Sequence, residues 1–523
     1  MVSSEALRLL SVGGVRIERI IQFQVDGRDV DVIDDDGSLL EALRDRLGVR
    51  SVKDGCSPQG QCGCCTVLID DAPRVACVTP LRRVSGRIVT TVDGLTEQER
   101  RRWSHAFVAH GAAQCGFCTP GIVCRFVGHE RKGADLGRRE TVDRALAAHL
   151  CRCTGWQTIR EAAAETSVDL PVRDLSPASQ QATIETGRPQ IVGPEVILGH
   201  GGFADDTAPL NALVAVRSET GWVTAPSLQE ARANMGKVQG RRTSLVSSPP
   251  LELPEGDWAV ALRTRWVEPA YLEIDASWCL PGGEAADPIA NGGAFGGKIG
   301  GEVANAARTL AREHDAPVRA LWSREDAVRY GIKRPPLAAG LHSDGSGIVR
   351  VARTAGIAAL IQSVLPDCEV EEVVVPGPPT SLSLRAAGWA EAEMLRTALD
   401  GKTRWVQSPS GGRAKADIVD GTIRVEVDVG EPLDWVMLRS YCIGAAHMGY
   451  SWVTSESIAV DNHGDVHDLT VRSFGVVSSS ETPNIEVVSV GEGEIRPAGE
   501  AVFAAVAAAT WLYRGCPVNL PTG

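Results

Sequence analysis

Ten of the fourteen cysteines lie between positions 56 and 153, in two groups of different spacing. The first group reads CSPQGQCGCC and is followed by Cys77, whereas the second reads QCGFC and, further along the chain, LCRC. Thiolates at such short intervals are ligands for soft metals, and four thiolates are what one iron–sulfur cluster needs. The sequence therefore predicts a chain that moves electrons.

The spacing assigns four ligands to each of two 2Fe–2S clusters. The first group is close to the C-x4-C-x2-C pattern of plant-type clusters, with one extra residue in the first gap. Nearby glycines let backbone N–H groups turn toward the sulfurs. Adjacent residues point apart, so Cys64 is expected to neighbour the site rather than bind it. The expected ligands are Cys56, Cys62, Cys65 and Cys77 in the first set, and Cys115, Cys118, Cys151 and Cys153 in the second.

Structural zinc is the main alternative, because zinc also takes four thiolates. A lone C-x2-C pair would favour zinc, but two complete sets, one of which contains C-x-C, favour iron and sulfide. The other cysteines are expected in packed cores, namely Cys124, Cys279, Cys368, Cys442 and Cys516.

Length and charge limit the remaining possibilities. A chain of 523 residues predicts three or four domains. The net charge of −13 and the absence of a basic run argue against a nucleic-acid partner. The first residues do not form a secretory signal, and no apolar run approaches the ~18 residues of a membrane span. We therefore expect a cytoplasmic protein without a membrane span, in a compartment where dense cysteine indicates metal.

Periodicity divides the chain into four parts. Residues 17–94 read as short strands around an Asp26-Gly27 turn, with a helix from Leu39 to Leu47 capped by Ser38. Residues 95–165 have helical spacing, and residues 166–190 read as a polar linker. Residues 191–523 mix strand-like and helical segments with glycine-rich loops.

The segments KDGCSPQGQCGCCTVLIDDAPRVAC and QCGFCTPGIV…LCRCTGW resemble the two-cluster module of the molybdenum hydroxylases, the xanthine dehydrogenase and aldehyde oxidoreductase family. The resemblance covers about residues 17–165. It implies an α+β multidomain protein with a ferredoxin-like β-grasp 2Fe–2S domain and a four-helix 2Fe–2S domain. In this family the helical-domain cluster lies nearer the molybdenum, and the ferredoxin-like cluster lies nearer the flavin.

The remaining two-thirds of the chain is similar, in patches, to the family's molybdopterin-binding portion. The stretch NGGAFGGK resembles the glycine loop that approaches molybdenum, which implies a molybdopterin-binding role for Gly292, Gly293, Phe295, Gly296 and Gly297. The tail SVGEGEIRPAGEAVFAAVAAAT resembles the stretch that holds the catalytic glutamate, which would be Glu492. A glutamate beside a metal-bound hydroxide acts as a general base.

Three departures from the family pattern concern this second portion. The segment before the glycine loop is too short to hold the family's usual glutamine. A cofactor-binding block is missing between Arg385 and Val427, and Gly493 replaces the usual proline. We therefore expect residues 191–523 to form a truncated, mixed α/β relative of the molybdopterin domain, with molybdopterin carried by a partner chain.

These observations predict the electron-transfer subunit of a multi-subunit molybdenum hydroxylase. Its two clusters would relay electrons from molybdenum to flavin or another acceptor, with FAD on a partner, and its C-terminal part would dock the catalytic subunit. One alternative is an enzyme that itself binds molybdopterin and oxidises aldehydes or N-heterocycles, with Glu492 as base. Another is a redox-sensing iron–sulfur protein without enzymatic activity.

Overall fold

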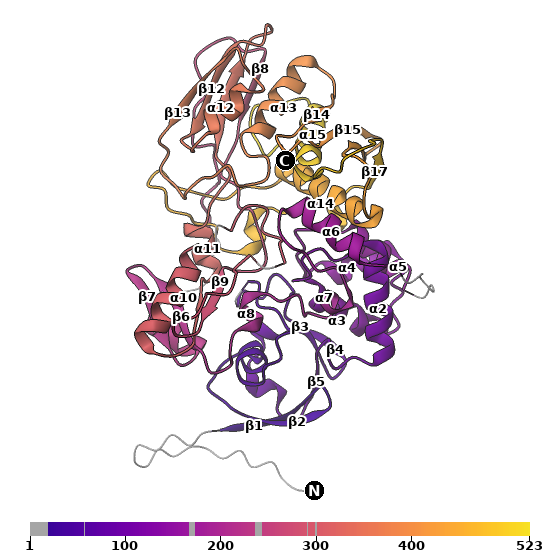
Figure 1. Ribbon diagram of the computed structural model, residues 1–523, viewed down its shortest axis with the longest axis vertical. Helices are drawn as coiled ribbons and strands as arrows, with labels where there is room; N and C mark the ends of the chain where they lie inside the picture. Colours follow the sequence, from indigo (N-terminus) through magenta and orange to yellow (C-terminus); the bar gives the residue numbers. More distant parts are fainter. Residues whose placement is uncertain (1–18, 57, 167–172, 236–242, 290, 299–300) are drawn as a thin grey trace.

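Four β-sheets and the helices around them form the protein (Figure 1). The computed structural model describes residues 19–56, 58–166, 173–235, 243–289, 291–298 and 301–523. The N-terminal sheet lies at one end of the molecule, and the sheet that contains β12 and β13 lies at the other end (Figure 1).

The N-terminal sheet has five strands in the order β2-β1-β5-β3-β4, in which only β1 and β5 pair in parallel. Asp26 and Gly27 make the turn between β1 and β2 with positive φ angles of 50° and 77°, as predicted. The predicted helix begins at Leu39 under a capping box from Ser38 and runs as α1 and a π-helical turn. The strands are β1 (Ile20–Val25), β2 (Arg28–Ile33), β3 (Thr66–Ile69), β4 (Ala72–Val75) and β5 (Ile88–Thr90), and the helical segments are α1 (Leu39–Glu41) and η1 (Ala42–Arg46).

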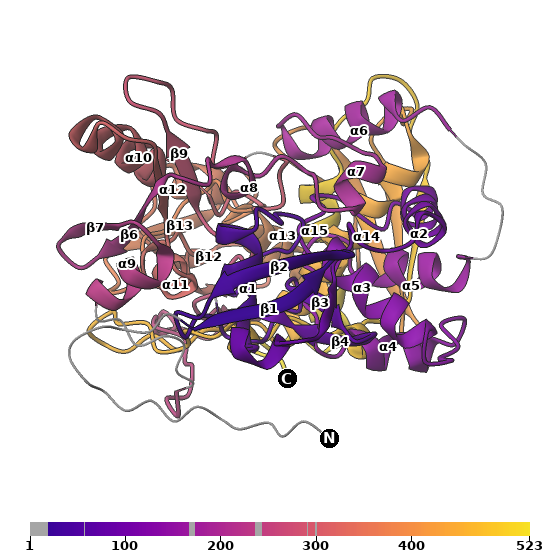
Figure 2. The same ribbon diagram turned by 90° about the horizontal axis from the view of Figure 1, so that it is seen from below.

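Four helices follow and lie to one side of this sheet, which α3 contacts at β3 and β4 (Figure 2). They are α2 (Glu97–His110), α3 (Thr119–Glu130), α4 (Arg139–Leu146) and α5 (Gln157–Ala164). Their core is aromatic: the fully buried ring of Trp103 stacks on Phe126 with centroids 5.2 Å apart. Pro120 lies in the first turn of α3, where its missing N–H costs nothing.

The segment predicted as a linker contains a helix, α6 (Ser176–Thr186), while residues 167–172 lie outside the described ranges. The composition of this helix is polar, but one edge of it is apolar. On that edge, Ala178 and Ala182 pack against Met437 and Tyr441 of a later helix. Gly187 ends α6 in the left-handed conformation. The segment predicted as a linker thus includes a helix that packs against the C-terminal part.

The C-terminal part contains three four-stranded sheets with the orders β7-β6-β10-β9, β13-β12-β11-β8 and β14-β15-β16-β17. Each has one parallel pair among antiparallel ones. The strands are β6 (Leu213–Ser218), β7 (Gly221–Ala225), β8 (Val260–Arg263), β9 (Ala276–Cys279), β10 (Val318–Leu321), β11 (Leu337–Leu341), β12 (Gly347–Ala352), β13 (Cys368–Val373), β14 (Val406–Gln407), β15 (Arg413–Val419), β16 (Thr422–Asp428) and β17 (Ile485–Ser489).

Two buried helices hold this part together. Helices α14 and α15 pack against each other, with the rings of Trp452 and Phe503 stacked at 5.4 Å. In the described ranges no helix combines the length and the apolar content needed to cross a bilayer. The α-helices of this part are α7 (Pro194–Ile197), α8 (Ala204–Thr207), α9 (Leu228–Met235), α10 (Gly301–His314), α11 (Arg324–Tyr330), α12 (Ile357–Gln362), α13 (Trp389–Asp400), α14 (Trp435–Thr454) and α15 (Gly499–Tyr513).

Arg324, the first residue of α11, joins the C-terminal part to the first cysteine loop. Its guanidinium is fully buried and donates hydrogen bonds to the carbonyl of Gly55 at 2.7 and 3.1 Å. It also donates to the carbonyls of Tyr271 at 2.8 Å and Leu272 at 2.7 Å. One side chain thus fixes the backbone beside Cys56 to a segment more than two hundred residues away.

Replacing Arg324 by Met should destabilise the protein by at least about 2 kcal/mol, because three buried carbonyls lose their donor. Urea unfolding followed by circular dichroism measures the effect. Arg329→Met, on the same helix but exposed, is the matched control and should stay within about 0.5 kcal/mol of the parent. Equal midpoints for the two variants would contradict this role of Arg324.

Candidate iron–sulfur centres

The first four predicted ligands meet where the loop before β3 faces the turn after β4. All four are buried, and the thiol of Cys56 contacts those of Cys62 and Cys77, while Cys65 contacts Cys77. The loop directs backbone N–H groups at sulfur: Gln61 donates to Cys56 Sγ and Cys77 to Cys65 Sγ, both at 3.4 Å. Such N–H···S bonds stabilise negative charge on thiolates.

The second four predicted ligands meet between the start of α3 and the turn before α5. The Sγ atoms of Cys115 and Cys153 are 3.5 Å apart, and Cys118 contacts Cys151. Each contact joins one cysteine of the C-x2-C pair to one of the C-x-C pair. Within the described ranges no three His, Cys, Asp or Glu side chains are arranged around a single metal ion. The thiol contacts are pairwise, and two thiolates per iron are what a 2Fe–2S cluster takes.

The thiol acidities follow from these contacts and from burial. A hydrogen bond donated by Cys118, together with one from Thr154, lowers the pKa of Cys151 to about 7. The pKa of Cys118 and that of Cys153 are raised well above the ordinary value, because each donates to its partner thiol and is buried. Four buried thiols ionise together only where a cation compensates their charge, so the donor set fits a metal cluster.

Cys64 lies between the two thiol sets. Its Sγ is 3.8 Å from the carbonyl oxygen of Cys62, and the second set is close enough for Cys151 to raise its pKa. Helix α3 meets the same loop, since a β-carbon on Gly121 would lie 2.5 Å from the carbonyl oxygen of Gly63. The two centres are therefore neighbours, which the spacing of the cysteines did not reveal.

The C-terminal part holds the LCRC turn from two sides. Arg152, between the two ligands of this turn, forms a buried two-pronged ion pair with Glu456 at 2.5 and 2.8 Å. On α14, a β-carbon at Gly444 would lie 1.7 Å from the carbonyl oxygen of Cys153. Only glycine permits so close an approach.

The glycine loop of residues 291–298 also packs on the second set. Asn291 Nδ2 donates to the carbonyl of Cys115 at 2.8 Å, and a β-carbon on Gly293 would lie 2.9 Å from Cys115 Sγ. Gly292 abuts Gln190, Gly296 abuts the carbonyl of Ser383, and Gly297 abuts Pro269 and Tyr271. The glycines thus let the loop pack tightly against protein, and its molybdopterin-binding role stays a prediction.

A cavity of about 520 Å³ opens beside Cys115 and the glycine loop. Phe295 lines it, together with charged and polar groups that the sequence analysis did not identify, among them Glu185, Arg385, Tyr441 and Glu500. Arg385 lies over the Phe295 ring, with its guanidinium carbon 4.8 Å from the ring centroid. These five residues come from five separate segments, so no sequence motif unites them.

Glu185 is the buried acid of this cavity. Its Oε2 accepts hydrogen bonds from the backbone N–H groups of Ala498 at 3.0 Å and Gly499 at 3.3 Å, where α15 begins. Burial nevertheless raises the pKa of its carboxyl to about 7. The group can therefore hold or release a proton near neutral pH, in the same cavity that Cys115 of the second thiol set lines.

Glu492, the predicted base, lies elsewhere. It is exposed in the turn after β17 and does not line the cavity. The acid of that stretch that reaches the cavity is Glu500, in the first turn of α15. The proposed role of Glu492 stays a prediction that this geometry does not support.

Known proteins match the cysteine-rich part most strongly. A family model for a 2Fe–2S iron–sulfur cluster binding domain matches residues 23–82, and one for a 2Fe–2S binding domain matches residues 91–164. The nicotine 6-hydroxylase small subunit of Paenarthrobacter nicotinovorans is 36% identical over 143 residues, which are 27% of this chain and 86% of that protein. The xanthine dehydrogenase iron–sulfur-binding subunit of Escherichia coli O157:H7 is 39% identical over 125 residues, 23% of this chain and 76% of that protein.

Longer proteins match as well. The aldehyde oxidoreductase of Megalodesulfovibrio gigas is 38% identical over 150 residues, but the match spans 27% of this chain and only 16% of that protein. The solved aldehyde oxidoreductase of Desulfovibrio desulfuricans superposes with a TM-score of 0.66 at 14% identity, covering 94% of this chain and 97% of that chain. This likeness concerns the fold, and the predicted α+β multidomain architecture is confirmed.

Replacing Gly444 by Ala should expel the second cluster, because the added methyl group displaces the carbonyl of Cys153. We expect the iron content to fall by about half, from the four irons of two 2Fe–2S clusters. Gly301→Ala, whose β-carbon would meet no atom within 4 Å, is the control and should keep all the iron. Full iron in both variants would show that α14 does not support the cluster.

Replacing Glu185 by Gln should change how stability depends on pH. The unfolded carboxyl loses its proton near its ordinary pKa of 4.5, whereas the folded one keeps it to about 7, so this group destabilises the fold as pH rises through that window. The melting temperature of Glu185→Gln, measured relative to that of the parent at the same pH, should therefore increase as the pH rises from 5 to 8. The exposed Glu219→Gln is the control, and a pH-independent difference for Glu185→Gln would refute the assignment.

Proposed function

We propose a function from one premise: the chain belongs to the xanthine dehydrogenase and aldehyde oxidoreductase family and carries two 2Fe–2S binding domains. It is an oxidoreductase subunit, and we infer that it transfers electrons within a multi-subunit molybdenum hydroxylase. The observation that carries this inference is the convergence of eight thiols, seven of them buried and that of Cys115 half-buried, into two neighbouring sets of four.

Each set has a defined task in this proposal. Cys56, Cys62, Cys65 and Cys77 bind one cluster, and Cys115, Cys118, Cys151 and Cys153 bind the other. The clusters, when bound, supply one-electron chemistry. The protein keeps water from the thiolates by burying them, and it stabilises their charge through the N–H groups of Gln61 and Cys77. The contact of Gly121 with the Gly63 loop makes the two centres neighbours, as transfer between them requires.

The direction of transfer follows from what adjoins each set. The second set lies beside the cavity at Cys115, so electrons from a molybdenum-containing partner would enter there. The first set lies in the N-terminal sheet domain and would pass them to a flavin subunit or another acceptor. The nicotine 6-hydroxylase and xanthine dehydrogenase relatives are subunits by their names, which supports such partners.

A second candidate function is supported by the cavity alone. Its position beside Cys115 and Phe295 would suit a molybdopterin bound by this chain itself. Gly292, Gly293 and Gly296 of the predicted loop line this cavity. Glu492, however, is exposed and lies outside it, which weighs against this candidate. Molybdenum analysis of the chain purified without partners separates the two proposals, because one molybdenum per chain would establish the second.

Cysteine variants test the partition of ligands. Cys77→Ser should abolish one of two electron paramagnetic resonance signals of the reduced protein, and Cys115→Ser should abolish the other. Two control variants should keep both signals. Cys516→Ser changes a cysteine far from both sets in the sequence, and Cys64→Ser changes the cysteine that neighbours the first set but is not a predicted ligand. Loss of both signals in one ligand variant, or of either in Cys64→Ser, would show that the ligands are wrongly divided.

A further inference from the structure

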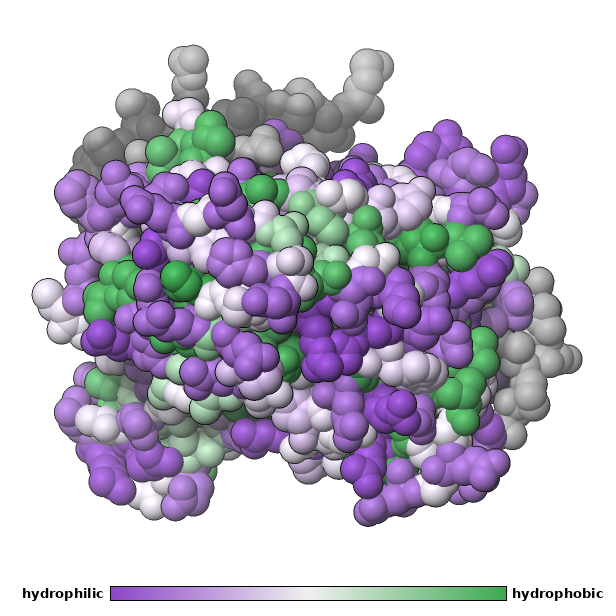
Figure 3. Space-filling model, turned by 90° about the horizontal axis from the view of Figure 1, so that it is seen from above, coloured by the Kyte–Doolittle hydropathy of each residue, from purple (hydrophilic) through white to green (hydrophobic). Residues whose placement is uncertain are grey.

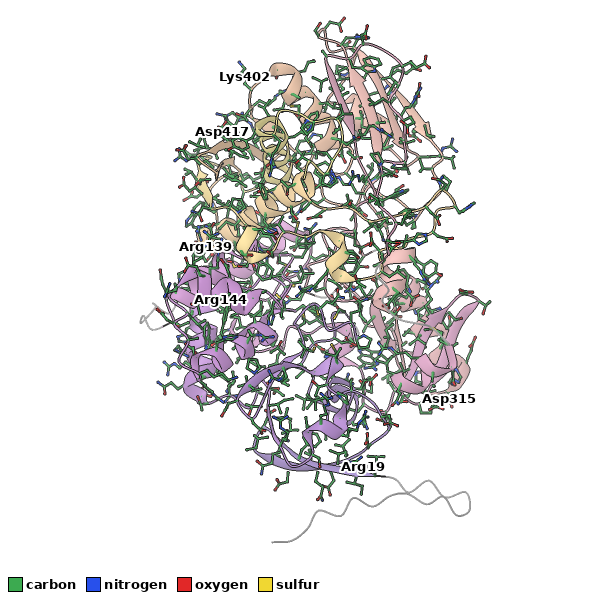
Figure 4. The ribbon with its side chains drawn as sticks, turned by 180° about the vertical axis from the view of Figure 1, so that it is seen from behind. Arg19, Arg139, Arg144, Asp315, Lys402 and Asp417 are labelled. Atoms are coloured by element: carbon green, nitrogen blue, oxygen red, sulfur yellow. The ribbon has the colours of Figure 1, made fainter. Side chains whose placement is uncertain are left out.

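Five basic side chains gather where the helical domain meets the first thiol set. They are Arg74 of β4, Arg125 and Lys132 at α3, Arg144 of α4, and Arg472 of the C-terminal part, and they are called the basic face here. Arg144 is labelled in Figure 4. Arg125 Nε is 3.2 Å from His149 Nε2, and Arg472 Nη2 donates to the carbonyl of Ala147 at 2.8 Å.

Among the described residues, none of these five cations forms an ion pair. The side chains of Arg74 and Arg144 bond only backbone carbonyls, of Pro73 at 3.1 Å and Glu140 at 3.2 Å. The cations of the basic face lie near one another around His129. Burial is the main cause that lowers the pKa of His129, and the positive charges of Arg125, Lys132 and Arg144 lower it further. Such a cluster is unfavourable in the isolated chain, and it is the more unusual because the net charge is −13.

The basic face borders the first cluster site directly. Arg472 donates from its backbone N–H to Gln61 Oε1 at 3.1 Å, and Gln61 belongs to the loop that holds Cys56 and Cys62. Arg125 is near enough to Cys65 for the thiol to affect its pKa. Val78, next to Cys77, is 53% exposed and packs against Gly60 of the same loop. The first cluster site thus has an exposed apolar residue beside one of its ligands, as protein interfaces often do.

Elsewhere the surface is less distinctive. On the face seen from above, hydrophobic residues form small groups among hydrophilic ones (Figure 3). Exposed cations near the N-terminal sheet, such as Arg82 and Arg87, are paired with Asp36 at 3.2 Å and Asp70 at 2.6 Å. The basic face differs from these pairs, because no carboxylate of the described ranges neutralises its five cations and because it adjoins the first cluster site.

We propose that the basic face is the docking surface for an acidic redox protein that takes single electrons from the first cluster. This inference rests on the proposed function, because it requires the cluster. Opposite charge raises the rate of encounter by about 10- to 1000-fold, and the effect falls with ionic strength. The acidic balance of the rest of the chain would repel such a partner and so direct it to this face.

Small oxidants of opposite charge test the proposal on the full chain. The dithionite-reduced protein is mixed with ferricyanide, a trianion, or with tris(phenanthroline)cobalt(III), a trication, and reoxidation is followed by stopped-flow absorbance. The patch variant is Arg74→Glu with Arg144→Glu, since both side chains are exposed and hold only one carbonyl each. The matched control is Arg353→Glu with Arg396→Glu, two exposed arginines near β12 and on α13.

At low ionic strength the patch variant should react about tenfold more slowly with ferricyanide and faster with the cobalt complex, while the control should match the parent. A polyglutamate 20-mer should slow ferricyanide reduction in the parent and the control but not in the patch variant. Equal ferricyanide rates in the patch variant and the parent would overturn the proposal. Iron content and resonance signals are recorded first, so a chain without clusters would refute the proposed function itself rather than the docking surface.

Discussion

Close packing of backbone around buried sulfur is the constraint on which the rest of the structure depends. Three close approaches, each made possible by a glycine, hold the thiol sets in place. Gly293 meets Cys115 and Gly444 meets the carbonyl of Cys153 in the second set, and Gly121 of α3 meets the first cysteine loop. Any larger residue at these positions would open the site to water. The contacts that shield the thiolates from water are therefore also the contacts that hold the domains together.

The same packing joins the C-terminal part to the cluster domains. This part shares one hydrophobic core with the cluster domains, since Trp266 and Phe474 belong to the same cluster of buried residues as Trp103. The buried pair of Arg152 and Glu456 and the carbonyl contacts of Arg324 add fixed polar links. This part also lines most of the cavity beside the second thiol set.

Local signals were readable from the sequence, whereas features made by distant segments were not. The ligand sets, the Asp26-Gly27 turn and the Ser38 cap depend on residues close together in the chain, and the turn and the cap are confirmed. Helix α6 was missed because its apolar edge is only two alanines wide. The cavity around Glu185 and the basic face around Arg125 each join several segments, so tertiary contacts alone reveal them.

The metal content of the full chain, purified without oxygen, tests the central claim most directly. Two 2Fe–2S clusters require about four irons and four acid-labile sulfides per chain, with no stoichiometric zinc. That result would establish the two thiol sets as electron carriers. A colourless protein with about two zinc ions and no sulfide would contradict the account, because four thiolates without sulfide make a structural zinc site.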